Sequence, residues 1–200
     1  MNTPRFFHLH HEDRDAVRQE LLAGLLATPA RTSPKYLYDA LGSRLFEAIT
    51  ALPEYYPTRT EAAILAAQGA ALAACLPRGA TLIDLGAGNC AKAASLFDLL
   101  APARYVAVDI SVDFLRDALQ TLQYRYPALD MVGVGLDFST GLALPGTLDD
   151  AAAPRVLFYP GSSIGNFTPV QALGFLRSVH AACGPAPGSG LLIGVDLVKD

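Results

Sequence analysis

Short apolar runs alternate with longer segments of helical periodicity through the second half of the chain. The runs are rich in valine, leucine, isoleucine and tyrosine, which is typical of strands buried on both faces of a parallel sheet. The intervening segments place apolar residues three or four positions apart, as amphipathic helices do. This order predicts an α/β fold with right-handed crossovers between parallel strands. The predicted strands cover Thr81–Leu85, Arg104–Asp109, residues 131–136, Arg155–Tyr159 and residues 191–196.

The first part of the chain follows a different pattern, in which helical stretches are separated by prolines and tyrosines. Residues 15–26 predict an amphipathic helix, and residues 45–49 form a shorter helical stripe. Thr58 and Glu61 fit a capping box, which predicts a further helix that runs to about Cys75. The sequence therefore predicts a helical segment ahead of the alternating strands and helices.

A glycine turn follows the first predicted strand and leads directly into a helix that begins near Ala91. Gly86 and Gly88 allow the backbone to turn sharply and to approach a ligand, and the helix start offers unpaired N–H groups. The spacing fits the dinucleotide pattern G-x-G-x-x-G/A, and Asp109 stands about 20 residues further on, where that fold binds the ribose. Asp84 favours a different ligand, because a carboxylate at the end of a buried strand is costly unless it is paired in a binding crevice. The order D-x-G-x-G resembles the first motif of methyltransferases whose cofactor, S-adenosylmethionine, has a cationic methionyl end.

Polar residues recur at the ends of the predicted strands. Asp84, Asp109, Asp137 and Asn166 each fall at or just beyond the carboxyl end of a different strand. In open α/β sheets these ends form the crevice that binds ligands. Each residue alone could cap a turn, but four of them from four strands predict a binding site.

Composition and charge narrow the class of protein. Apolar residues make up 52% of the chain and charged residues 17%, which indicates a globular domain. A net charge of −4 without a basic run gives no support for nucleic-acid binding, and we expect no membrane segment and no signal peptide. The three cysteines lack C-x-x-C spacing, so a reducing cytoplasm is expected. His8, His10 and His11 lack a second group of ligands at metal spacing, which favours a solvated tail and no bound metal.

Longer motifs occur in a distinctive order: S-P-K-Y-L-Y-D, L-P-E-Y-Y-P-T-R-T-E, D-L-G-A-G, P-G-S-S-I-G-N-F-T-P and G-V-D-L-V-K-D. Together they resemble the histidine Nα-methyltransferases of ergothioneine biosynthesis, over about residues 34–200. Y-Y-P-T-R and S-I-G-N-F-T-P are far more specific than the glycine turn, and they disfavour the dinucleotide cofactor. The resemblance implies a Rossmann-like class I methyltransferase core in residues 78–200, preceded by a helical segment, residues 1–77, that contributes to the substrate pocket.

The resemblance also implies which residues bind S-adenosylmethionine and which bind the amino acid L-histidine. Tyr56 and Asn166 match histidine-binding positions, and Tyr38 matches a tyrosine near the reacting amine. We expect Tyr38 and Asn166 to position the α-amine, because a hydroxyl and an amide orient its hydrogens without favouring protonation as a carboxylate would. The implied cofactor-binding residues are Asp84, Gly86, Gly88, Lys92, Asp109, Asp137 and Phe138.

The expected reaction is transfer of methyl groups to the α-amine of L-histidine, ending at the trimethylated product hercynine. The resembling proteins continue beyond G-V-D-L-V-K-D with two more strands and a substrate-capping region. The resemblance therefore predicts a chain truncated at its C-terminus, with its fifth predicted strand near an open sheet edge. Two alternatives are a related methyltransferase acting on another amino acid or aromatic amine, and a non-catalytic module that binds the cofactor.

Overall fold

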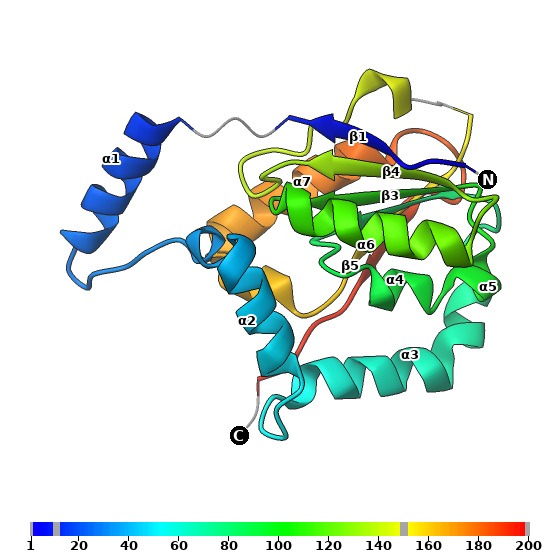
Figure 1. Ribbon diagram of the computed structural model, residues 1–200, viewed down its shortest axis with the longest axis horizontal. Helices are drawn as coiled ribbons and strands as arrows, with labels where there is room; N and C mark the ends of the chain where they lie inside the picture. Colours follow the sequence, from blue (N-terminus) through cyan, green and yellow to red (C-terminus); the bar gives the residue numbers. More distant parts are fainter. Residues whose placement is uncertain (1, 10–12, 149–151, 199–200) are drawn as a thin grey trace.

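The computed structural model describes residues 2–9, 13–148 and 152–198 of the 200-residue chain. Its centre is a six-stranded parallel sheet in the order β1-β4-β3-β2-β5-β6 (Figure 1). From β2 the chain adds β3 and β4 on one side, and it then returns to add β5 and β6 on the other. This reversal opens a crevice at the carboxyl ends of β2 and β5. The strands are β1 (Arg5–His8), β2 (Thr81–Leu85), β3 (Arg104–Asp109), β4 (Asp130–Gly135), β5 (Arg155–Tyr159) and β6 (Gly190–Ile193).

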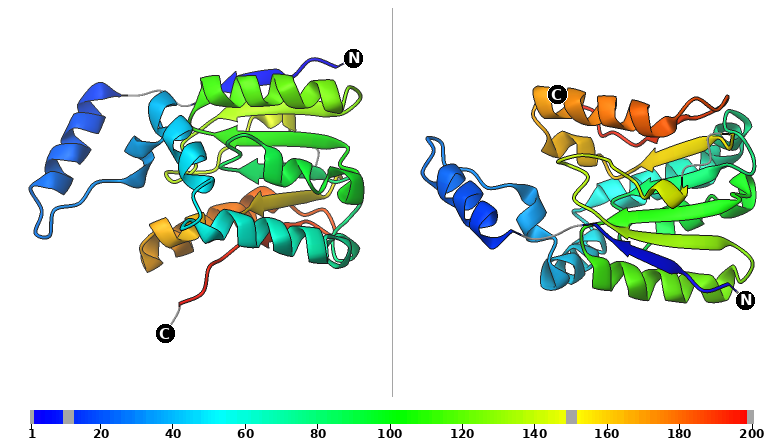
Figure 2. Two further views of the ribbon diagram at one scale, coloured as in Figure 1. Left: turned by 60° about the horizontal axis from the view of Figure 1, so that its bottom comes forward. Right: turned by 90° about the horizontal axis from the view of Figure 1, so that it is seen from above.

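Helices cover both faces of the sheet, which gives three layers (Figure 2). The helices are α1 (Arg14–Leu25), η1 (Pro34–Leu37), α2 (Ala40–Thr50), α3 (Tyr56–Ala74), α4 (Ala91–Ala94), α5 (Phe97–Leu100), α6 (Val112–Arg125), η2 (Gly146–Leu148), η3 (Ser163–Asn166) and α7 (Pro169–Cys183). Leu65 of α3 and Leu115 of α6 belong to the core on one face, and Phe175 of α7 belongs to the core on the other. The predicted Rossmann-like α/β fold is confirmed. None of the helices within the described residues combines the length and apolar character needed to cross a membrane.

Most strand predictions hold within one residue. Strands β2, β3 and β5 have the predicted bounds, and β4 begins and ends one residue earlier than expected. Strand β6 lies at a sheet edge, as predicted, but it ends at Ile193. The backbone N–H of Gly194 still donates to the carbonyl of Tyr159 at 3.0 Å, whereas that of Asp196 donates to the Ser162 hydroxyl at 2.9 Å. The chain therefore leaves the sheet because its next partners belong to the loop after β5.

The prediction of a solvated N-terminal tail was wrong for its first part. Strand β1 pairs in parallel with β4 and forms the other edge of the sheet. Phe6 packs against the core on one face and Phe7 against the core on the opposite face, since successive strand residues point to opposite sides. His8 ends this strand, whereas His10 and His11 lie outside the described residues. An isolated run of two phenylalanines is too short a signal to predict a strand from sequence.

The capping box predicted for the long helix was also wrong. Helix α3 starts at Tyr56, with Pro57 in its first turn and no side-chain hydrogen bond at the cap. Thr58 therefore lies inside the helix. Glu61 is left free to point away from the helix start, and its carboxylate binds Lys92 and the backbone of Gly161 instead.

One further local feature differs from the prediction. The helix expected to run on from Ala91 is split into α4 and α5, and at the break the Ser95 hydroxyl donates to the carbonyl of Lys92 at 2.6 Å. Ser111 occupies the N-cap position of α6, but its side chain makes no capping hydrogen bond. At the start of α7, by contrast, the Thr168 side chain caps the helix and completes a capping box with Gln171.

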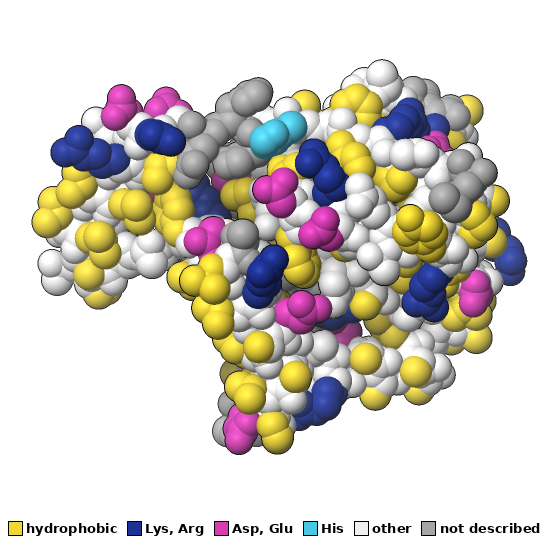
Figure 3. Space-filling model, in the orientation of Figure 1, with side chains coloured by type: hydrophobic (Ala, Val, Ile, Leu, Met, Phe, Trp, Pro, Cys, Tyr) yellow, Lys and Arg dark blue, Asp and Glu magenta, His cyan; other side chains and the backbone are white. Residues whose placement is uncertain are grey.

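Helix α1 confirms the predicted helical segment but does not bury its apolar face. It stands to one side of the sheet (Figures 1 and 2), and none of its residues is buried. Leu22 is 48% exposed and Leu25 is 59% exposed. Figure 3 shows hydrophobic side chains spread over the surface of this region and of α2. The amphipathic pattern therefore predicts the helix correctly but not its packing.

Candidate active site

A cavity of about 1030 Å³ lies at the carboxyl ends of β2, β3, β4 and β5. The loops after these strands form one side of it, and residues of α1, η1, α2 and the start of α3 form the other. This is the place where the order of strands reverses, and where open α/β sheets bind their ligands. All but one of the predicted site residues line this cavity. The residues that do so are Tyr38, Asp84, Gly86, Gly88, Lys92, Asp109, Asp137, Phe138 and Asn166.

Asp84 is a buried carboxylate at the end of β2. One of its oxygens accepts a hydrogen bond from the Tyr105 hydroxyl at 2.8 Å, and the other has no hydrogen-bond partner among the described residues. Burial raises the pKa of Asp84 from 3.8 to about 7, against the opposing effect of the Tyr105 hydrogen bond. A buried, unpartnered carboxylate oxygen on a cavity wall is costly unless a ligand donates to it, and a cationic ligand compensates it best.

The glycine turn brings the chain close to Asp109. Gly86 and Gly88 have φ values of +74° and +51°, which favour glycine. One oxygen of Asp109 accepts the Gly88 N–H at 2.9 Å, and the other accepts the Ser111 N–H at 2.9 Å. Burial raises the pKa of Asp109, and these backbone hydrogen bonds oppose the rise. Because each carboxylate oxygen has two acceptor sites, Asp109 fixes the turn and can still accept from a ligand.

The loop after β4 presents a carboxylate and an aromatic ring. Asp137 accepts the backbone N–H of Ser139 at 3.1 Å and its hydroxyl at 2.5 Å. The Phe138 ring packs edge to face against Tyr159, with ring centroids 5.9 Å apart. The Phe138 ring also lies 3.7 Å from the position that a side-chain carbon on Gly86 would take. The ring therefore lies close to the glycine turn on the cavity wall.

Lys35 connects this loop to the N-terminal helices. Its Nζ lies 2.8 Å from Glu20 and 3.6 Å from Asp137, and the Tyr36 hydroxyl donates to the same Glu20 carboxylate at 2.8 Å. The carboxylates of Glu20 and Asp137 raise the pKa of Lys35, although its partial burial acts in the opposite direction. Sequence reasoning gave Lys35 and Glu20 no role in the site. Their association depends on two segments that meet only in the folded chain.

Lys92, next to the glycine turn, forms an ion pair with Glu61, and its Nζ lies 2.5 Å from Oε2 of the glutamate. The remaining Glu61 oxygen accepts the Gly161 N–H at 2.8 Å. Lys92 lines the cavity and Glu61 does not. The sequence offered no separate signal for Glu61, since the same residue satisfied the capping-box pattern.

Tyr38 and Asn166 reach the cavity from opposite sides. Tyr38 follows η1 and packs edge to face with Phe46, with centroids 6.1 Å apart. Phe46 packs in turn with Tyr55, at 5.9 Å. Burial raises the pKa of Tyr38, and the neighbouring Tyr55 and Asp109 add to the rise, so its phenol stays protonated at neutral pH. Asn166 ends η3 and is exposed on the cavity wall.

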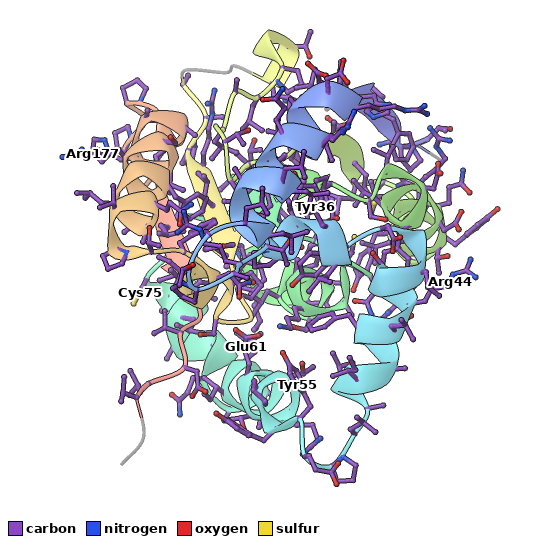
Figure 4. The ribbon with its side chains drawn as sticks, turned by 90° about the vertical axis from the view of Figure 1, so that its left-hand side faces the viewer. Tyr36, Arg44, Tyr55, Glu61, Cys75 and Arg177 are labelled. Atoms are coloured by element: carbon purple, nitrogen blue, oxygen red, sulfur yellow. The ribbon has the colours of Figure 1, made fainter. Side chains whose placement is uncertain are left out.

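Tyr56 is the predicted site residue that the structure does not bring to the cavity. Its ring is 39% exposed, and its hydroxyl donates a short hydrogen bond to Asp196. Tyr55 lines the cavity instead, at the start of α3 (Figure 4). Neighbouring residues at a helix start point about 100° apart, so only one tyrosine of the pair can face the same way. The histidine-binding role of Tyr56 stays a prediction.

Comparison with known proteins agrees with the sequence resemblance. The family described as histidine-specific methyltransferase, SAM-dependent, matches residues 17–200. The chain is 41% identical over 190 residues to histidine N-alpha-methyltransferase from Mycolicibacterium smegmatis, covering 93% of this chain and 57% of that protein. It is 38% identical over 189 residues to the protein of the same name from Mycobacterium tuberculosis, covering 92% and 57%. The chain thus spans 57% of the length of both relatives.

A solved structure supports the fold. Mitomycin 7-O-methyltransferase aligns with a TM-score of 0.55 and 19% identity, over 93% of this chain and 50% of that chain. At this identity the likeness concerns the fold alone. The family match covers most of the sequence, including every segment that lines the cavity. The chain therefore belongs to the histidine-specific, S-adenosylmethionine-dependent methyltransferases.

Proposed function

We propose that this chain forms the cofactor site, and one side of the amino-acid site, of an enzyme that methylates the α-amine of L-histidine. The product after three transfers is hercynine, the trimethylated amino acid. The observation that carries the proposal is a single cavity lined by Asp84, the glycine turn and Asp109 together with Tyr38 and Asn166. Family membership supports histidine as the amino acid, and the free state of all three cysteines supports a reducing cytoplasm.

The residues present fit S-adenosylmethionine. The unpartnered oxygen of Asp84 suits the cationic methionyl end, and Asp109 retains acceptor sites for the two ribose hydroxyls. Asp137 and Phe138 offer an acceptor and an apolar ring to the adenine. Lys92 is the cation on the same wall, and it suits the methionyl carboxylate. When bound, the cofactor supplies an electrophilic methyl group on a sulfonium sulfur.

The protein's own contribution is to hold an uncharged amine in line with that methyl group. Tyr38 remains a neutral phenol, and Asn166 carries no charge, so neither stabilises an ammonium ion as a carboxylate would. Their hydroxyl and amide orient the amine at attack distance. Tyr38, Phe46 and Tyr55 also present aromatic rings, which tolerate the positive charge that grows with each methyl group. We propose that residues 1–77 contribute to the amino-acid pocket through these side chains.

Two measurements test the proposed function. Calorimetric titration should detect binding of S-adenosylmethionine and of its demethylated product, S-adenosylhomocysteine, and negligible binding of NAD. Mass spectrometry should detect mono-, di- and trimethylated histidine when the chain encoded by the complete gene is incubated with L-histidine and S-adenosylmethionine. L-tryptophan is the control substrate, and preferential methylation of tryptophan would assign the pocket to another amine. Tighter binding of NAD than of S-adenosylhomocysteine would overturn the cofactor assignment.

A further inference from the structure

The carboxylate of Glu61 joins three segments that are distant in the sequence. It projects from the second turn of α3 toward the rest of the molecule (Figure 4), and its side chain is only 16% exposed. Oε2 lies 2.5 Å from the Nζ of Lys92, at the start of the glycine-turn helix. Oε1 accepts the N–H of Gly161, in the loop after β5, at 2.8 Å. Both oxygens therefore have a partner on a different structural element.

Two glycines leave room for this carboxylate. A side-chain carbon on Gly194, just after β6, would lie 2.0 Å from Oε1 of Glu61, which no real contact allows. A side-chain carbon on Gly161 would lie 3.2 Å from the Nζ of Lys92, and Gly161 has a φ of +78°. The backbone is thus shaped around the ion pair. A glutamate that merely covered a surface would not require such close approach.

The two partners of Glu61 belong to two different loops of the cavity wall, one after β2 and one after β5. Lys92 lines the side that carries the glycine turn and Asp84. Gly161 opens the loop that runs through η3 to Asn166. The same loop is tied to the segment after β6, because the Ser162 N–H donates to the carbonyl of Gly194 at 3.1 Å. Movement of the Glu61 carboxylate would therefore release both loops.

We propose that Glu61 is a positioning residue that fixes Lys92 toward the cofactor with one oxygen and the Asn166 loop toward the amino acid with the other. This inference rests on the proposed function, since it assigns the Lys92 loop to the cofactor and the Asn166 loop to the amino acid. Glu61 touches neither ligand, because it does not line the cavity. Its carboxylate pairs with the Lys92 ammonium and accepts the Gly161 N–H. Contacts of this kind, in which at least one group is ionised, are the strongest polar contacts in proteins.

Two substitutions separate the two contacts. In Glu61→Gln the amide oxygen can still accept the Gly161 N–H, but its NH₂ group repels the Lys92 ammonium. In Glu61→Ala both contacts are lost. Both variants should raise the KM for S-adenosylmethionine and the Kd for S-adenosylhomocysteine by about tenfold, the effect of losing one charged hydrogen bond. Only Glu61→Ala should also raise the KM for histidine about tenfold and speed amide hydrogen exchange in residues 161–166.

The control variant is Glu54→Gln, which makes the same change of charge at an exposed residue just before α3. It should match the wild type in each measurement. Acetylation of Lys92, followed by mass spectrometry, gives a further measurement that needs no ligand. Lys92 should react faster in both Glu61 variants than in the wild type or the control, because its ammonium is no longer held by a carboxylate.

Gly194→Ala provides a second route that keeps the carboxylate. The added methyl group should push Glu61 off its partners and reproduce the Glu61→Ala phenotype. In a Glu61→Ala background the same change should have little further effect, since the remaining close neighbour is Pro160 at 3.4 Å. Additive effects of the two substitutions would overturn the proposal.

The outcomes separate this inference from the proposed function. If the wild-type chain fails to bind S-adenosylhomocysteine, the proposed function fails, while hydrogen exchange and Lys92 acetylation still decide the role of Glu61. If the ligand binds but both Glu61 variants behave as the wild type, the inference fails alone. It also fails if glutamine and alanine give the same losses on the histidine side, because a general loss of packing would affect the two variants alike.

Discussion

The two sides of the cavity are built by different physical means. The sheet wall consists of the cavity-lining residues at the ends of β2–β5, and the helical wall consists of those on α1, η1 and α2. Strand residues behind the sheet wall are almost all buried in two apolar cores. By contrast, α1 and η1 contain no buried residue. The sheet wall is therefore fixed by packing, whereas α1 and η1 of the helical wall are attached without a buried side chain of their own.

This difference sets how strongly the side chains of each wall are held in place. Full burial of a leucine side chain stabilises a protein by about 1.5–3 kcal/mol, but Leu41 is 65% exposed and Leu45 is 55% exposed. Lys35 of η1 instead forms ion pairs with Glu20 of α1 and with Asp137 of the sheet wall. Partly exposed ion pairs contribute about 0–1 kcal/mol and weaken with salt. Substitutions in the sheet wall should therefore change ligand affinity strongly, and those in the helical wall should change mobility more than affinity.

The largest effect is expected for Asp109→Ala in the sheet wall. The substitution removes a charged acceptor for two ribose hydroxyls, so S-adenosylhomocysteine should bind about 100-fold more weakly. It also leaves the N–H groups of Gly88 and Ser111 without their acceptor, which should lower the free energy of unfolding by about 1–3 kcal/mol. Calorimetry measures the first change and urea unfolding the second.

Asp109→Asn is the matched control, because its amide oxygen can still accept one of the two backbone N–H groups. It should recover part of the stability and little of the affinity. Normal ligand binding by Asp109→Ala would show that this carboxylate only caps the turn. The sheet wall would then be preformed without being a ribose site.

A smaller, pH-dependent effect is expected from Asp84. The ligand-free protein should take up a proton on Asp84 below a pKa of about 7, whereas a bound cationic methionyl group requires the ionised form. Affinity for S-adenosylhomocysteine should therefore fall by up to about tenfold for each pH unit below 7 and stay level above it. The stability of the ligand-free chain should follow the opposite trend. Because burial raises the folded pKa above its ordinary value of 3.8, stability is lost as pH rises toward 7.

Asp84→Asn should abolish both pH trends. Its amide oxygen can still accept the Tyr105 hydroxyl, so the fold should be retained. Affinity at pH 8 should fall by about tenfold, because a neutral amide replaces the anion that pairs with the ligand. Calorimetry between pH 5.5 and 8, repeated in buffers of different ionisation enthalpy, measures the affinity and the proton released. An affinity that does not change with pH in the wild type would contradict the pairing of Asp84 with a cation.

The smallest effect on affinity is expected for Lys35→Met in the helical wall. Loss of its contacts with Glu20 and Asp137 should weaken ligand binding by only about threefold, since partly exposed ion pairs contribute little. Hydrogen exchange in α1 should become faster, while exchange in β2 and β3 stays unchanged. Arg18→Met, at an exposed position of α1, is the control. A loss of affinity as large as that of Asp109→Ala would show that the two walls contribute equally.

The sequence by itself determined the inner strands of the sheet and most of the residues that line the candidate site. The apolar runs at β2, β3 and β5 gave the strand bounds directly, because strands buried on both faces are continuous in apolar residues. The same pattern predicted that Asp84, Asp109 and Asp137 gather at one edge of the sheet, because parallel strands bring their carboxyl ends together. The specific motifs identified the family without any knowledge of the fold.

Only the tertiary structure decided which residues find their partners in distant segments of the chain. The short run at β1 becomes a strand because β4 offers a free edge, and Phe6 and Phe7 then reach two different cores. The choice of Tyr55 over Tyr56 at the cavity depends on the residue at which α3 begins, which local propensity does not fix. In the sequence, Glu61 fits a local helix cap. In the structure, its carboxylate instead pairs with Lys92 of α4 and accepts the backbone N–H of Gly161 in the loop after β5. Such contacts depend on distances between segments, and no periodicity along the chain encodes them.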